Sequence, residues 1–233
     1  MSLMTKFLFD VDGTLTDARK PIDPAFENVM LDFVRNHECV IVTGSDRAKT
    51  LEQIGERLTN SFETVYHCSG NHVFENGVEV GRTDWELSKE QYDFLQQQLD
   101  KIDYPEKVGN HIEQRVGTAN FSICGRNADW DQRARYVEWE EHNKARHIVA
   151  MAYNEMFEES EALVAGETSI DIFALGKDKS QVTKLYKDTT TIYFGDKCFQ
   201  GGNDWSAAKI ATKYYQIDRG YKQTWEILKK RYI

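Results

Sequence analysis

The sequence lacks the features that mark membrane-spanning, secreted and nucleic-acid-binding proteins. It has no apolar run near the roughly 18 residues that a membrane-spanning helix requires, and we recognise no signal peptide. Its formal net charge of −9 does not favour nucleic acid or an anionic membrane as a partner. Internal repeats and low-complexity segments are also absent, which argues against a repeat architecture or a disordered chain.

Cysteine is scarce, and its spacing carries no metal or redox motif. The four cysteines, Cys39, Cys68, Cys124 and Cys198, include no C-x-x-C pair. A chain of 233 residues is also too large to depend on disulfide bonds for its stability. We therefore expect free thiols, a reducing compartment and a cytoplasmic location.

The ends of the chain alternate between strands and helices. Lys6–Asp10, Cys39–Thr43 and Thr191–Gly195 are short apolar runs typical of buried parallel strands. Asp46–Leu58 and Asp204–Thr212 have helical spacing. This rhythm predicts an α/β core with a doubly wound, Rossmann-like parallel sheet, formed by residues 1–81 and 176–233.

The middle of the chain has a different pattern. Strands at His111–Gln114 and Ala119–Cys124 follow one another closely, and a long charged helical stretch covers Asp129 to Phe157. Strands paired through short connections, with helices beside them, are typical of an α+β domain. We therefore expect residues 82–175 to form an inserted α+β domain.

Two carboxylates follow the first predicted strand. Asp10 and Asp12 have the spacing that points two side chains the same way, and Gly13 allows a sharp turn. Ligands of open α/β sheets bind outside the carboxyl ends of the strands. Adjacent carboxylates repel unless a cation such as Mg²⁺ relieves them, and a carboxylate can attack phosphorus. The alternative for Asp-x-Asp-Gly is a plain surface turn.

Three further segments carry candidate residues near predicted strand or helix ends. Thr43 and Gly44 precede a helix, where a hydroxyl and backbone amides suit an anion, although an ordinary helix cap at Ser45 or Asp46 explains this segment better when it is taken alone. Lys179 stands at a helix start, against the helix dipole, which suggests a role in holding phosphate; a solvated surface lysine is the alternative. Asp196 follows the late strand and could complete a carboxylate cage around Mg²⁺, while Asn203-Asp204 opens the next helix.

These pieces, in this order, resemble the haloacid dehalogenase (HAD) superfamily of phosphotransferases. Asp10-Val11-Asp12-Gly13-Thr14 is similar to its first motif, Thr43 to its second, Lys179 to its third, and Asp196 with Asn203-Asp204 to its fourth. The resemblance implies Mg²⁺ as cofactor and a type C2 cap as the inserted domain. It also implies a catalytic group and a metal-binding group: Asp10, Asp12, Thr43 and Lys179 for catalysis, and Asp10, Asp12, Asp196, Asn203 and Asp204 for the metal.

The chain further resembles eukaryotic-type phosphomannomutases, which interconvert mannose 1-phosphate and mannose 6-phosphate. Gly195-Asp196-Lys197 through Gly201-Gly202-Asn203-Asp204 has that family's spacing, and Ile112-Glu113-Gln114-Arg115 and Gly125-Arg126 are similar to its cap strands. The resemblance implies a sugar-phosphate substrate and a homodimer formed through the cap. The residues implied in substrate binding are Gly44, Arg115, Arg126, Arg133, Ser169 and Asp171. Taken singly, each arginine is better explained by a surface ion pair, but three arginines at family positions reverse that preference.

Thr43 keeps a second function open. Phosphomannomutases of this type usually have glycine at this position, and a hydroxyl there is typical of the superfamily's hydrolases. A HAD sugar-phosphate phosphatase is therefore an alternative to the mutase. A non-catalytic sugar-phosphate sensor on the same fold is the third hypothesis.

Overall fold

The computed structural model describes residues 5–233, which divide into two compact units. The core unit comprises the described residues up to Thr83 together with Lys177–Ile233, and the cap unit comprises Asp84–Gly176. From the sequence we expected the core at 1–81 and 176–233 and the insertion at 82–175; residues 1–4 lie outside the described part of the chain.

The core unit is built on one sheet with strand order β11-β10-β1-β2-β3-β4-β5. Strands β11 to β3 in this order are parallel, and β4 and β5 extend the edge as an antiparallel hairpin closed at Asn76-Gly77. The strands are β1 Thr5–Phe9, β2 Glu38–Val42, β3 Thr64–His67, β4 His72–Glu75, β5 Val78–Arg82, β10 Thr190–Gly195 and β11 Lys213–Gln216.

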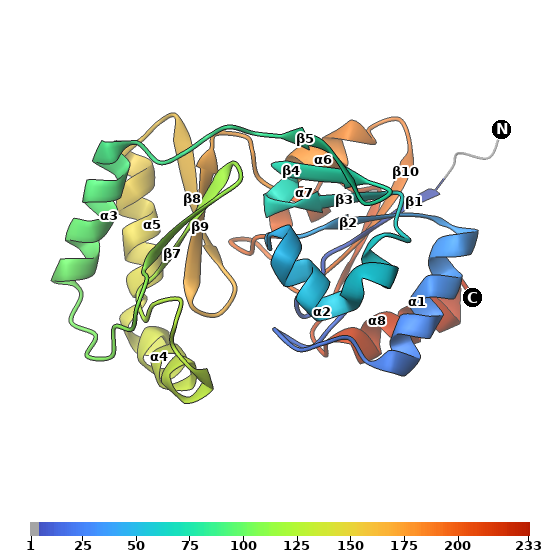
Figure 1. Ribbon diagram of the computed structural model, residues 1–233, viewed down its shortest axis with the longest axis horizontal. Helices are drawn as coiled ribbons and strands as arrows, with labels where there is room; N and C mark the ends of the chain where they lie inside the picture. Colours follow the sequence, from blue (N-terminus) through green and yellow to red (C-terminus); the bar gives the residue numbers. More distant parts are fainter. Residues whose placement is uncertain (1–4) are drawn as a thin grey trace. The chain divides into compact units, whose positions relative to one another are not determined.

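Helices cover both faces of the core sheet (Figure 1). α1, α2 and α8 contribute to one apolar cluster, while α6 and α7 pack into a second cluster on the opposite face. The helices are α1 Pro24–Asn36, α2 Arg47–Thr59, α6 Ser180–Leu185, α7 Trp205–Ala208 and α8 Tyr221–Arg231, with a short 3₁₀ turn at Cys68–Gly70. The central strands are apolar along their length because both faces are covered. The predicted doubly wound α/β core is confirmed.

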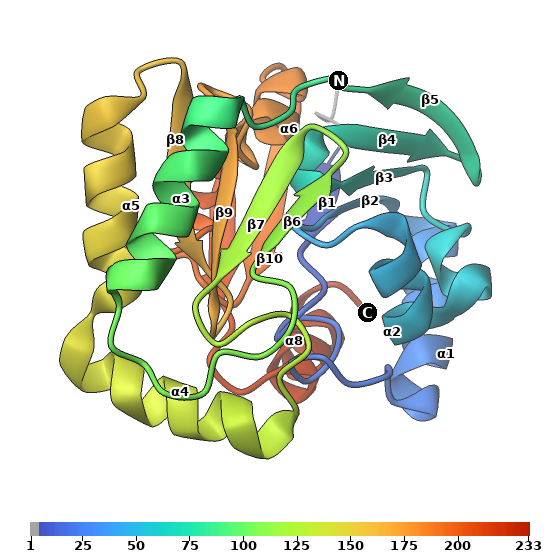
Figure 2. The same cartoon turned by 60° about the vertical axis from the view of Figure 1, so that its left-hand side comes forward.

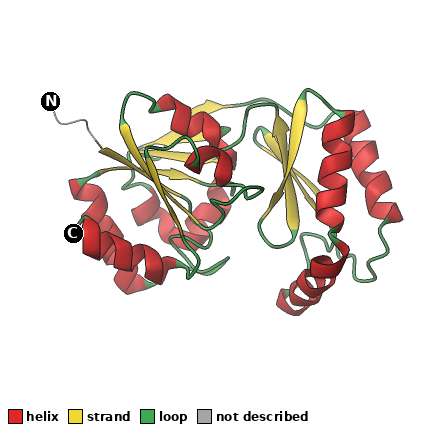
Figure 3. Ribbon diagram, turned by 180° about the vertical axis from the view of Figure 1, so that it is seen from behind, coloured by secondary structure: helices red, strands yellow, loops and turns green. Residues whose placement is uncertain are grey.

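The cap unit has a four-stranded antiparallel sheet in the order β6-β7-β9-β8. Its helices lie on one face of this sheet (Figure 3), and α3 and α5 run side by side (Figure 2). Its elements are α3 Lys89–Lys101, β6 Ile112–Arg115, β7 Thr118–Ser122, α4 Trp130–Asn143, α5 Ala145–Met156, β8 Ser160–Ala165 and β9 Ser169–Ala174. The predicted α+β cap is confirmed.

Alternation along the cap strands separates two kinds of residue. Ala119, Phe121, Ile170 and Ile172 belong to the apolar cluster that the cap helices complete. Their neighbours along the strands point to the other face of the sheet, because successive side chains alternate. The candidate substrate-binding residues on the strands belong to this second, polar face.

Two helix predictions were wrong in extent. The stretch expected from Asp129 to Phe157 is two helices, because Lys144 takes a left-handed conformation with φ of 51°. The helix expected over Asp204–Thr212 is only the single turn of α7. Thr212 instead exchanges hydrogen bonds of 3.0 and 3.1 Å with Thr191, which leads the chain into β11 beside β10.

Within residues 5–233, no helix combines the length and the apolar character that crossing a lipid bilayer requires.

Candidate active site

Asp10 lies immediately beyond the carboxyl end of β1. Its backbone N–H donates to the Phe194 carbonyl at 2.9 Å. This bond continues the pairing with β10 and fixes the position of the Asp10 backbone, from which the carboxylate extends. The residue is only 4% exposed. Gly13 follows with φ of +78°, and a Cβ atom there would lie 2.7 Å from Oδ2 of Asp196. A larger residue at 13 would therefore displace the carboxylate of Asp196.

Lys179 bridges two buried carboxylates of the core unit. Its Nζ lies 2.7 Å from Oδ1 of Asp10 and 2.7 Å from Oδ1 of Asp204. The lysine is 1% exposed and directly precedes α6 as its N-cap residue. Burial opposes its charge, yet the two carboxylates raise the pKa of Lys179 well above its usual value. The ammonium group therefore stays protonated.

Asp204 is held by three donors in the interior. Besides Lys179, the Tyr193 hydroxyl donates to Oδ1 at 2.6 Å, and the Lys197 backbone N–H donates to Oδ2 at 3.1 Å. Burial alone would raise the pKa of Asp204, but Lys179 and these hydrogen bonds hold it below its ordinary value. Asp204 is therefore an ionised carboxylate inside the protein.

Asp10, Asp196 and Asp204 form a carboxylate cluster. One oxygen from each lies within 4.8 Å of those of the other two. Burial, with repulsion from Asp204 and Asp12, raises the pKa of Asp10 to about 7 although Lys179 opposes the shift. Burial, with repulsion from Asp10 and Asp204, raises the pKa of Asp196 to about 8. One ammonium group does not neutralise three carboxylates, so the cluster suits a further cation.

The donor set fits a hard divalent cation. Oδ1 of Asn203 is buried and has no hydrogen-bond partner among the described residues, so it is a further oxygen acceptor next to Asp204 in the chain. Carboxylate and amide oxygens are the ligands that Mg²⁺ prefers in proteins. The predicted metal ligands Asp10, Asp196 and Asp204 are thus brought together, which supports a divalent-cation site.

The carboxylate of Asp12 does not belong to this cluster. Its Oδ1 accepts hydrogen bonds from the Gln53 side chain at 2.8 Å and from the Arg19 backbone N–H at 2.5 Å. Gln53 is 2% exposed and also contacts the Thr16 hydroxyl. The sequence analysis missed Gln53. The signal was a polar residue on the apolar face of α2, beside Ile54.

Thr43 follows β2, the strand parallel to β1. It is buried, and its hydroxyl oxygen accepts from the Ser45 backbone N–H at 3.1 Å. Asp46 is the N-cap of α2 and accepts from the Lys49 N–H at 2.8 Å, so the cap expected as the alternative reading is present. Because the carboxyl ends of parallel strands meet at one sheet edge, Thr43 and Gly44 lie on the same edge as Asp10.

The polar face of the cap sheet carries most of the remaining candidates. Glu113 forms ion pairs with Arg115 at 2.5 Å and with Arg126 at 3.1 Å. Oδ1 of Asp171 accepts from the Asn120 amide at 2.7 Å. Glu113 pairs with Asn120 and Asn120 with Asp171 across three strands, so these groups form one row.

Ser169 and Arg133 flank this row in different ways. Ser169 opens β9 two residues before Asp171, on the same face of the sheet. Arg133 is 7% exposed and donates to the carbonyls of Ala128 and Arg126 and to the Thr168 hydroxyl. These contacts hold the loop of Arg126 against the start of β9.

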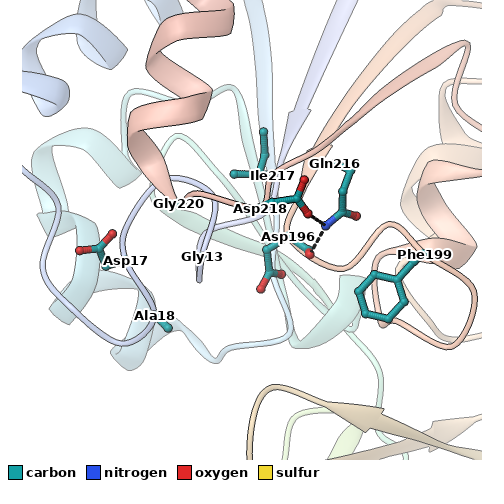
Figure 4. Close-up of a pocket in the computed structure, with 9 residues that line it drawn as sticks. All are labelled: Gly13, Asp17, Ala18, Asp196, Phe199, Gln216, Ile217, Asp218 and Gly220. Atoms are coloured by element: carbon teal, nitrogen blue, oxygen red, sulfur yellow. Dashed lines mark hydrogen bonds between the residues drawn. The ribbon is translucent and has the colours of Figure 1, made fainter.

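A cavity of about 360 Å³ lies in the core unit beside the carboxylate cluster (Figure 4). Asp196 contributes to its wall, and Asp17 and Asp218 add two further carboxylates. Its full lining is Gly13, Asp17, Ala18, Asp196, Phe199, Gln216, Ile217, Asp218 and Gly220.

Solved structures with similar folds are HAD phosphatases and related enzymes. The IMP-nucleotidase of Plasmodium falciparum matches with a TM-score of 0.63 at 14% identity, over 97% of this chain and 67% of its own. The C-terminal domain of the Candida albicans trehalose-6-phosphate phosphatase matches with a TM-score of 0.63 at 16% identity, over 97% and 91%. At these identities the likeness concerns the fold alone.

Sequence comparisons are more specific. The model of the eukaryotic phosphomannomutase family matches residues 26–225. The phosphomannomutase of Arabidopsis thaliana is 34% identical over 214 residues, which cover 85% of this chain and 84% of that protein. Phosphomannomutase 1 of Dictyostelium discoideum is 32% identical over 221 residues, or 89% of each chain. The resemblance expected from the motifs is thereby confirmed, and the chain belongs to the eukaryotic phosphomannomutase family of the HAD superfamily.

Proposed function

We propose that the protein is a Mg²⁺-dependent phosphomannomutase that transfers a phosphoryl group through Asp10. The observation that carries this proposal is the buried contact of Lys179 with both Asp10 and Asp204, beside Asp196. It combines a nucleophile, a fixed cation and a metal-ligand set at one sheet edge. Family membership supports hexose phosphates as the substrate class, with mannose 1-phosphate and mannose 6-phosphate as the pair interconverted.

In the first step, a carboxylate oxygen of Asp10 attacks phosphorus in line. A bond forms between that oxygen and phosphorus while the bond to the sugar oxygen breaks, giving an aspartyl-phosphate. Lys179 favours the ionised form of Asp10 and orients its carboxylate through the 2.7 Å contact. Asp10, Asp196, Asn203, Asp204 and the Asp12 carbonyl would hold Mg²⁺, which supplies charge neutralisation at the phosphoryl oxygens.

Asp12 is the group that moves the proton. We propose that it protonates the departing sugar oxygen and later accepts the proton of the hydroxyl that attacks the aspartyl-phosphate. Its separation from the carboxylate cluster by hydrogen bonds to Gln53 and Arg19 leaves it to act apart from the metal. Thr43 and the amide of Gly44 add hydrogen bonds to the transferred phosphoryl group.

We propose that the cap binds the part of the substrate that does not react. Arg115 and Arg126 offer planar guanidinium groups for the second phosphate, and Ser169 and Asp171 suit sugar hydroxyls. The packing of Arg133 under the Arg126 loop supports an indirect contribution from this third arginine. A homodimer through the cap and a cytoplasmic location, the latter consistent with four buried free cysteines, belong to the same proposal.

A sugar-phosphate phosphatase is the second candidate, and Thr43 is the observation that favours it. A hydroxyl beside the phosphoryl site would help to hold an attacking water, in which case the acceptor is not a sugar. The third hypothesis, a sensor without catalysis, is opposed by the complete set of Asp10, Asp12, Lys179 and Asp196 on one sheet edge.

Product analysis separates these three functions. The protein is incubated with mannose 1-phosphate, Mg²⁺ and a hexose bisphosphate activator, and sugar phosphates and inorganic phosphate are quantified. A mutase yields mannose 6-phosphate, a phosphatase yields inorganic phosphate instead, and a sensor yields neither. Asp10→Asn should abolish turnover, while Asp188→Asn, an exposed carboxylate in the same unit, should retain it. Unchanged activity in Asp10→Asn would remove Asp10 from the mechanism.

A further inference from the structure

Gln216 ties the loop that carries Asp196 to the end of β11. Its Oε1 accepts from the Cys198 backbone N–H at 2.7 Å, and its Nε2 donates to the Asp196 carbonyl at 2.5 Å. The same Nε2 lies 3.0 Å from Oδ1 of Asp218 (Figure 4). One side chain therefore satisfies a donor and an acceptor of the loop at the same time.

The backbone of Gln216 is itself well anchored. It pairs with Gly195 in the parallel register of β10 and β11, and the next residue, Ile217, donates to the Gly195 carbonyl at 2.8 Å. From the other side, the Gln223 amide donates to the Gln216 carbonyl at 3.0 Å. Because the backbone of Gln216 is held in place, its side chain can restrict the movement of the loop that it binds.

The carboxylate of Asp196 is closely packed on one side. It packs against Gly13 so closely that a single added carbon at 13 would reach 2.7 Å from Oδ2. Asp196 is only partly buried, and its other face lines the cavity beside the cluster. Lys179 and Tyr193 fix Asp204, but neither contact reaches Asp196. The placement of Asp196 therefore depends on its loop.

We infer that Gln216 is a positioning residue, which holds the Asp196 loop so that Asp196 can complete the divalent-cation site. This inference rests on the proposed use of Mg²⁺. Groups that orient a ligand without touching the metal commonly change metal affinity by roughly 10–100-fold when they are removed. Gln216 acts through the backbone of Asp196, so we expect an effect at the lower end of that range.

The test compares Mg²⁺ binding by titration calorimetry in the wild type, Gln216→Met and the control Gln97→Met. Methionine preserves length but removes both hydrogen bonds to the loop. We expect Gln216→Met to bind Mg²⁺ roughly 10-fold more weakly, with a raised Mg²⁺ requirement for turnover and kcat largely restored at saturating Mg²⁺. The control Gln97→Met makes the same substitution at an exposed glutamine of α3 in the cap unit and leaves the Gln216 bonds intact, so its affinity should stay within about 2-fold of wild type.

A second variant covers the case in which Gln216→Met fails to fold. Gln216→Glu keeps the acceptor for the Cys198 N–H but loses the donor to the Asp196 carbonyl, and should weaken Mg²⁺ binding in the same direction. Wild-type affinity in either folded variant, or a fall in kcat that saturating Mg²⁺ does not restore, would overturn the inference. A wild-type protein that binds no Mg²⁺ would instead overturn the proposed function.

Discussion

Neutralising Asp196 should stabilise the metal-free protein at alkaline pH while it removes the response to Mg²⁺. In Asp196→Asn, an amide of nearly the same shape replaces the carboxylate beside Gly13. Burial and the charges of Asp10 and Asp204 raise the pKa of Asp196 to about 8, from an ordinary value of 3.8. Holding this group ionised without a metal therefore works against folding.

The size and sign of the effect follow from proton linkage. The unfolded chain releases the Asp196 proton near pH 4, whereas the metal-free folded protein keeps it until about pH 8. Stability from this group is present below pH 4 and is lost as the pH rises towards 8. A gap of about 4 pH units corresponds to on the order of 5 kcal/mol at pH 8, and to nothing below pH 4. The amide introduced by Asp196→Asn does not titrate, so the variant avoids this loss.

Urea unfolding in EDTA at pH 5 and pH 8, followed by circular dichroism, measures the difference. Asp196→Asn should exceed the wild type by several kcal/mol at pH 8 and by clearly less at pH 5. Adding Mg²⁺ should stabilise the wild type, more at pH 8 because the ligands must be ionised, and leave the variant nearly unchanged. The control Asp188→Asn should follow the wild type throughout. If Asp196→Asn were less stable than wild type in EDTA at pH 8, the electrostatic reasoning would be wrong.

Three other predictions concern single side chains. Gln53→Met should lower kcat about 10-fold and leave KM nearly unchanged, since the Gln53 amide donates to the Asp12 carboxylate and holds it in place; an unchanged kcat would contradict this role. Lys144→Gly should raise the free energy of unfolding by about 0.5–1 kcal/mol, because Lys144 has φ of 51°, and Lys144→Ala should not. Burial and nearby positive charge lower the pKa of His67 to about 3, so the free energy of unfolding falls as the pH drops below 6.5, where the unfolded chain binds a proton that the folded protein does not. His67→Gln does not titrate and should recover about 2 kcal/mol of the lost free energy of unfolding at pH 5, measured by urea unfolding.

The general form of the fold and its carboxylate cluster could be predicted because both depend on patterns that are local in the sequence. Apolar runs of four or five residues predict buried parallel strands, and their carboxyl ends bring Asp10 and Asp196 to one edge. The Asn76-Gly77 pair predicts the hairpin for an equally local reason, since both residues take positive φ.

Contacts that depend on tertiary packing could not be predicted. Gln53 and Gln216 look like ordinary polar residues in the sequence, and only the packing of α2 and β11 against the loops brings their amides to Asp12 and Asp196. The break at Lys144 is equally hidden, because lysine carries no preference for the left-handed conformation. The premature end of α7 depends on Thr191, which is 21 residues from Thr212.

Lys179 shows how a conflict between local preference and structure identifies a functional site. A cation at the start of a helix is disfavoured by the helix dipole by roughly 0.3–1 kcal/mol. Full burial adds a larger desolvation cost, and 1% exposure gives the ammonium group almost no water. Both costs are offset only because Asp10 and Asp204 each approach to 2.7 Å. No local pattern favours a buried cation there, so the residue is best explained by the proposed phosphoryl transfer, which would need a fixed positive charge beside the attacking carboxylate.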